Sequence, residues 1–193
     1  MPLSLVTEPV NKALTLAQAK DHLRVEHNEE DCYIESLISC ATEYVQNTTG
    51  CQLITATYRL TLDCFPDGAD TICLLPPVQS VTSINYVDTQ GVSQLLPTSD
   101  YYTDILSSPA RLVPAYSKVW PTARLQPSSV VIEFITGFGD EYKQVPETIR
   151  EAMRLLVAHW YDIREPVVLG GTPQNVPMTV DALLWQKRVI TFV

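Results

Sequence analysis

The spacing of apolar residues along this chain changes from helical to alternating and then back to helical. One set recurs at intervals of three and four, as on a single helix face: Ile34, Leu37, Ile38, Ala41 and Val45. From Ile54 to Cys64 every second residue is apolar, which is the pattern of a strand with one buried face. Helical spacing returns after Pro146. The chain must therefore form helices on both sides of a region of strands.

Capping residues predict where the two N-terminal helices begin and end. Thr15-Leu16-Ala17-Gln18 fits a capping box, so a first helix is predicted from Thr15 to about Val25. A second helix is predicted from Asn28, because acidic residues follow it and favour the positive end of the helix dipole. Gly50 is suited to end this helix as a C-terminal cap.

Short strand patterns separated by turn residues fill the middle of the chain. After the strand at 54–64, strands are predicted at 71–75, 81–87, 101–105, 111–113 and 130–135. The sequence Asp88-Thr89-Gln90-Gly91 predicts the turn of a hairpin.

Two further helices are predicted near the C-terminal end. Pro146 is a favourable first helical residue, and Pro166 would end the helix. A last short helix is predicted from about Thr179 to Arg188. This order predicts an α+β fold. We expect residues 1–50 and 139–193 to form one helical bundle, with 51–138 as an inserted antiparallel β region.

The charge and hydropathy of the chain exclude several classes of protein. The net charge is −9 and the isoelectric point about 4.7, so duplex DNA binding through a broad basic face is not expected. No run of 18 apolar residues is present, and we expect no membrane span. The N-terminus has no signal-peptide pattern, so a cytoplasmic product is expected. Residues 1–50 hold most of the acidic excess, with eight acidic and three basic side chains.

Motifs for catalysis, cofactor binding and metal binding are missing. There is no nucleophile elbow, P-loop or zinc-protease motif, and Gly137-Phe138-Gly139 lacks the later glycine of a dinucleotide fingerprint. His22 and His27 are five residues apart, so a solvated helix and loop explain them better than a metal site does. The five cysteines form no CxxC pair and are expected to be reduced and mostly buried. We therefore predict no catalytic, cofactor or metal site.

A long proline-rich segment is the first candidate for binding a partner. It carries Tyr116, Lys118, Trp120 and Arg124 between Pro114 and Pro127. Either it is a long connection pinned by Trp120, or it is an exposed loop that contacts a neighbouring subunit, since loops of this length usually have a function.

Several segments, in this order and spacing, resemble the head–tail connector (adaptor) proteins of tailed bacteriophages. The central one is LPPVQSVTSINY at residues 75–86, followed by DTQG at 88–91. Others are LTLAQAKDHLRV at 14–25, PARL at 109–112, GFG at 137–139, VPETIR at 145–150 and the stretch 160–165. Cys51 departs from the family pattern, in which arginine commonly follows the Thr-Gly pair.

The resemblance implies a structural role in virus assembly and no enzymatic activity. Family members form a ring of about twelve copies on the portal, and such a ring needs two complementary surfaces on each copy. The ring extends the DNA channel, through which DNA passes without sequence-specific binding, and it bridges to tail or stopper proteins. The implied location is the virion neck, with the bacterial host cytoplasm during assembly. The alternatives are another neck component, such as a stopper or tail-completion protein, and a small hydrolase, which a bound metal would favour.

The C-terminal residues are the second candidate for binding a partner. The basic pair Lys187 and Arg188 precedes an apolar end with Val189, Ile190, Phe192 and Val193. Leaving these side chains in water is unfavourable by roughly 1.5–3 kcal/mol each. The tail is therefore expected either to dock on the portal, which the resemblance favours, or to fold back on its own bundle.

Overall fold

The computed structural model describes residues 2–68, 70–164 and 178–189, and the predicted α+β class is confirmed. The described residues form four α-helices and eight strands, and all strand pairs are antiparallel. The chain divides into two compact units. The sheet unit comprises the described residues of 1–10 and 55–138, and the helical unit those of 11–54 and 139–190.

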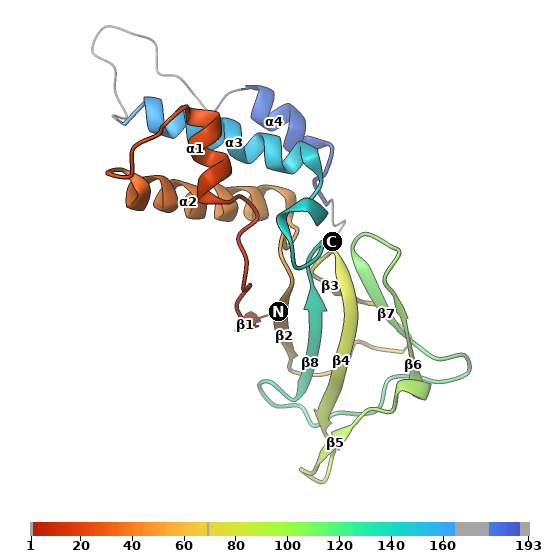
Figure 1. Cartoon of the computed structure of the whole chain (residues 1–193). Helices are drawn as coiled ribbons and strands as arrows, with labels where there is room; N and C mark the ends of the chain where they lie inside the picture. The colour runs from red at the N-terminus through yellow and green to blue at the C-terminus, as the bar shows by residue number, and fades with distance from the viewer. Residues whose placement is uncertain (1, 69, 165–177, 190–193) are drawn as a thin grey trace, which may run out of the picture. The chain divides into compact units, whose positions relative to one another are not determined.

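Two antiparallel sheets make up the sheet unit (Figure 1). The five-stranded sheet has the order β1 (Leu3–Thr7), β2 (Ala56–Leu62), β8 (Val130–Thr136), β4 (Val78–Val87) and β5 (Ser93–Leu95). The three-stranded sheet has the order β3 (Ile72–Leu74), β7 (Ala110–Pro114) and β6 (Tyr101–Asp104). A short 3₁₀ turn, Thr98–Asp100, precedes β6.

Several strands in the middle of the chain place one face in a core. Along β8, Val130, Ile132 and Phe134 are fully buried, while the residues between them are only partly covered. Leu60 and Leu62 of β2 and Ile84 of β4 join the same core. Since β8 pairs with β2 on one side and β4 on the other, it is the central strand of the larger sheet.

The helical unit contains α1 (Leu16–Leu23), α2 (Asp31–Thr49), α3 (Glu147–Asp162) and α4 (Met178–Trp185), with a 3₁₀ turn at Tyr142–Gln144. Helix α3 packs against the other three helices. Its buried side chains are Ile149, Ala152, Met153, Leu156 and Val157. No described helix is long and apolar enough to cross a membrane.

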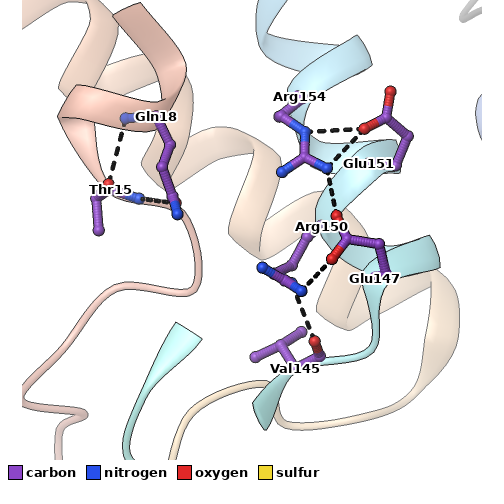
Figure 2. Close-up of polar contacts among 7 residues, drawn as sticks. All are labelled: Thr15, Gln18, Val145, Glu147, Arg150, Glu151 and Arg154. Carbon is purple, nitrogen blue, oxygen red and sulfur yellow. Dashed lines mark hydrogen bonds and ion pairs between the residues drawn. The ribbon is translucent and has the colours of Figure 1, made fainter. Parts of the chain in front are cut away.

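Two of the predicted caps of the N-terminal helices, at Thr15 and Gly50, are confirmed. The predicted start of the second helix at Asn28 is wrong, because α2 begins at Asp31 with Glu30 as its N-cap and no side chain caps it. The Thr15 hydroxyl accepts a hydrogen bond from the Gln18 amide, and the Gln18 side chain accepts one from the Thr15 amide (Figure 2). Gly50 adopts a left-handed conformation, with φ of 69°, and ends α2. Helix α1 ends two residues earlier than predicted because Arg24 is also left-handed.

Ionic contacts hold the start of α3. The guanidinium groups of Arg150 and Arg154 both pair with Glu147, and Arg154 also pairs with Glu151 (Figure 2). Arg150 donates a further hydrogen bond to the Val145 carbonyl at 3.1 Å. Pro146 is the N-cap of this helix and not its first residue as predicted, while Pro166 lies outside the described residues.

Strand β1 was not predicted. Residues 1–10 were expected beside the N-terminal helices, but Leu3–Thr7 pair with β2 at the edge of the larger sheet. The register of this pairing shifts between Leu5 and Thr7. Residues 3–7 show only a short alternation of apolar and polar side chains. The partner strand begins nearly fifty residues later, and a local pattern carries no signal of such a pairing.

Candidate interaction surfaces

The histidines and cysteines of the described chain form no arrangement that could carry chemistry. No group of three or more His, Cys, Asp or Glu side chains among the described residues could hold a metal. Among the described residues, His27 Nε2 lies 3.9 Å from a carboxylate oxygen of Glu30 at the surface. His22 is exposed on the last turn of α1.

The cysteines correct one expectation. Cys51 is buried, and this burial raises the pKa of its thiol. The other four, Cys32, Cys40, Cys64 and Cys73, are exposed and not buried as predicted. The two on α2 lie on its exposed face, opposite the buried residues Ile34, Ile38 and Ala41.

Trp120 pins the proline-rich segment to the sheet unit. It is only 7% exposed, and its ring stacks on Phe65 with centroids 5.2 Å apart and an interplanar angle of 5°. Its indole N–H donates a hydrogen bond to the Asp70 carbonyl at 2.8 Å. Of the two alternatives, Trp120 therefore fits the connection pinned to the sheet unit, because its ring packs in the core and its indole N–H has an acceptor.

The other predicted residues of this segment lie at the surface. Tyr116 is 90% exposed. Lys118 forms an ion pair with Asp100, and the hydrogen bond from Lys118 lowers the pKa of that carboxyl. Arg124 is exposed, and its amide donates to the Val87 carbonyl at 2.8 Å. A Cβ added at Gly91 would come within 2.9 Å of Arg124 Nη1, so the guanidinium lies against the β4–β5 turn.

The predicted C-terminal docking residues are described only in part. Lys187 and Arg188 are exposed, and neither forms an ion pair with any residue that the structure describes. The Val189 amide donates to the Thr49 carbonyl at the end of α2 at 2.8 Å. Ile190, Phe192 and Val193 lie outside the described residues.

Two exposed apolar residues of α4 were missed by the sequence reading. Met178 is 88% exposed and Trp185 is 65% exposed, while Val180 and Leu184 on the other face are buried. Arg188 lies over the Trp185 ring, with its guanidinium carbon 5.5 Å from the centroid. The sequence carries one sign of this surface: α4 has apolar residues on both faces, which is unusual for a helix at a protein surface.

A charged aromatic cluster joins the end of α3 to the start of α2. Arg164 lies over the rings of Tyr33 and Tyr161, at 4.8 and 5.1 Å from their centroids. Glu30 accepts hydrogen bonds from the Tyr161 hydroxyl and from Arg164, and these lower the pKa of its carboxyl. These contacts join residues at the end of α3 to residues at the start of α2 within the helical unit.

Comparison with known proteins points to one role. Residues 13–82 match the family model described as "Phage gp6-like head-tail connector protein". The predicted resemblance to phage head–tail connectors is confirmed. The matched stretch runs from α1 into β4 and so includes parts of both units.

Solved structures similar to the chain belong to the neck and virion of gene transfer agent particles. One is a chain of the virion of the native particle, with 26% identity and a TM-score of 0.81. A second is from the neck of the empty particle, computed with C6 symmetry, with 26% identity and a TM-score of 0.77. A third is from the neck of the native particle, computed with C12 symmetry, with 25% identity and a TM-score of 0.76.

Each similarity covers 100% of this chain and 98% of the matched chain. No curated protein sequence matches the chain. The proteins of the matched family and the matched neck chains are structural components of particles and not enzymes. This agrees with the structural role predicted from the sequence.

Proposed function

We propose that this chain is a head–tail connector that forms a ring on the portal in the neck of a phage or phage-like particle. The observation that carries the proposal is full-length similarity to chains of particle necks computed with C6 and C12 symmetry. In this role the ring extends the DNA channel and bridges to tail or stopper proteins. Assembly takes place in the bacterial host cytoplasm.

The two predicted parts of the chain fit this role as separate structural modules. The helices before and after the β region form one bundle in this proposal, supported by the packing of α3 on α1, α2 and α4. The β region, predicted as 51–138, forms an insertion with its own core. A module with its own core can present loops to a neighbour without disturbing the helices.

The acidic charge of the chain suits a conduit for DNA. With a net charge of −9, copies arranged around DNA would offer few fixed phosphate contacts. Contacts between cations and phosphates dominate non-specific affinity for DNA, so their scarcity lets the duplex pass without sequence-specific binding.

The C-terminal end is the proposed portal-docking element. Lys187 and Arg188 are cations without a described ion-pair partner, and they precede the apolar residues Val189, Ile190, Phe192 and Val193. Trp185 extends the same surface with an exposed ring under Arg188. Aromatic and arginine side chains are the types that most often dominate binding energy in protein interfaces.

Electron microscopy of purified necks tests the ring. We expect density for this chain in multiple copies around the portal axis. A single copy, or a position remote from the portal, would instead favour a stopper or tail-completion protein.

Deletion of residues 189–193 tests docking. We expect loss of binding to portal rings with an unchanged melting temperature. A large drop in melting temperature with retained binding would show that the tail belongs to the protein's own core.

A further inference from the structure

Both edges of the five-stranded sheet carry exposed apolar side chains and no charged residue within the strand. At one edge is β1, and at the other is β5. Neither residues 2–7 nor residues 92–96 contain a charged side chain. Proteins commonly protect open strand edges with charges, especially lysine, so two uncharged edges indicate surfaces that meet another chain.

The surface at the first edge, here called the β1 surface, consists of Leu3, Leu5, Val6 and Glu8. Leu5 is 43% exposed, and Leu3 and Val6 are exposed to a similar extent. Glu8 follows the strand directly and makes no ion pair with any residue in the described ranges. This surface is therefore apolar with one free carboxylate.

The surface at the opposite edge, here called the β5 surface, consists of Val92, Leu95 and Arg124. Val92 is 54% exposed and Leu95 is 64% exposed. Arg124 lies against Gly91 in the turn just before Val92. The sheet unit has four basic residues, and in its described part Arg124 alone lacks an ion pair, since Arg59, Arg111 and Lys118 are all paired.

These two surfaces complement each other but cannot meet within one molecule. Four strand spacings, about 19 Å in all, separate β1 from β5 across the sheet. Each offers apolar side chains, and their free charges are opposite in sign. Different patches that fit each other on separate copies make a heterologous contact, which generates rings when the rotation closes.

We infer that the β1 surface of one copy binds the β5 surface of the next and forms the contact between neighbouring subunits of the ring. This inference rests on the proposed function and names the surfaces that would close the ring. It revises the predicted inter-subunit segment: Arg124 remains part of the contact, whereas Trp120 stays in the core of its own subunit.

Complementation between two variants tests the heterologous contact. Leu5→Asp disables the β1 surface, and Leu95→Asp disables the β5 surface. Each should weaken association roughly 10- to 100-fold, the factor expected when a charge replaces a leucine that becomes buried. Mixed together, they should form dimers and no larger species, because each variant retains one working surface. Sedimentation velocity and native mass spectrometry over a concentration series measure this.

Charge exchange tests the same contact without an aspartate in the strand. Glu8→Arg or Arg124→Glu alone should weaken association about three- to tenfold, because like charges then face each other. Both changes in one chain should restore association. Melting temperatures of all five variants, the two with aspartate and the three with exchanged charges, should match that of the unchanged protein, since every altered side chain is exposed.

The outcomes separate this inference from the proposed function. Rings that persist in Leu5→Asp and Leu95→Asp would leave the connector role intact and overturn the assigned surfaces. An effect of one variant alone would indicate a two-fold symmetric contact and would also overturn them. An unchanged chain that stays monomeric at every concentration would overturn them as well.

Discussion

At the scale of single residues, charged hydrogen bonds hold the turns of the sheet unit. Asp104 at the end of β6 accepts hydrogen bonds from the Ser107 hydroxyl at 2.6 Å and from Arg111 at 2.6 Å. These contacts lower the pKa of the Asp104 carboxyl to about 2. The stabilisation is present above the ordinary pKa of 3.8 and is lost as the pH falls through 2.

We expect a carbon NMR titration of Asp104 to show a midpoint near 2, and Ser107→Ala to move that midpoint toward 3.8. Ser93→Ala, which changes a serine of β5, serves as the control and should leave the midpoint unchanged. A midpoint near 3.8 in the unchanged protein would show that the turn does not hold Asp104 in solution.

Trp120→Ala should destabilise the sheet unit by about 3–5 kcal/mol, the range measured when a large buried aromatic side chain is removed. The variant loses the stacking on Phe65 and leaves the Asp70 carbonyl without its indole donor. Chemical denaturation measures the change.

Tyr116→Ala in the same segment is the matched control. It should alter stability by no more than about 0.5 kcal/mol, because its side chain is almost fully exposed. Equal effects of the two variants would contradict the assignment of Trp120 to the core.

The residue types alone could not separate these two aromatic positions. Tyr116 and Trp120 occur four residues apart in one proline-rich segment, with the same kind of neighbours. Trp120 is buried and Tyr116 is exposed, because Trp120 stacks on Phe65 and donates a hydrogen bond to Asp70, some fifty residues earlier. The contacts of Lys118 with Asp100 and of Arg124 with the turn at Gly91 could not be predicted either, since the partners are far apart in the sequence.

At the scale of helices and strands, the sequence predicted an element correctly where the whole capping or alternation pattern lies within that element. The capping box at Thr15 and the glycine at position 50 both act as predicted, because each cap is closed within a few residues. Strand β2 was also predictable, since its seven residues alternate between apolar and polar side chains. Strand β1 was missed because its pairing depends on a distant strand, and the exposed face of α4 was missed because apolar residues lie on both faces of that helix.

Thr15→Ala should cost about 1 kcal/mol of stability by removing the side-chain half of the capping box. Thr15→Ser keeps the hydroxyl and should cost much less. Thermal unfolding followed by circular dichroism compares the two. Equal losses would show that the cap does not stabilise α1 in solution.

Deletion of residues 1–7 should leave the remaining strands folded. Strand β1 is at the sheet edge and its residues are exposed, so the deletion removes one ladder of hydrogen bonds and little core. We expect a lower melting temperature with an unchanged pattern of near-ultraviolet circular dichroism. Loss of all tertiary signal would mean that β1 is required for the sheet to form.

At the scale of the whole molecule, each unit has a core of its own, and the two are expected to respond separately to damage. Met153→Ala removes a fully buried side chain from α3, and Phe134→Ala removes one from β8. We expect each to speed amide hydrogen exchange mainly within its own unit. Uniform acceleration across both units in either variant would show a single cooperative structure.

The central place of β8 has a consequence for how the protein is made. Strands β2 and β4 do not pair with each other, and both wait for residues 130–136. A nascent chain on the ribosome therefore leaves one edge of β2 and one edge of β4 without a partner strand until residues 130–136 are made, and exposed strand edges readily aggregate. A message cut short before codon 130 should yield an insoluble or rapidly degraded fragment, and not a smaller folded protein.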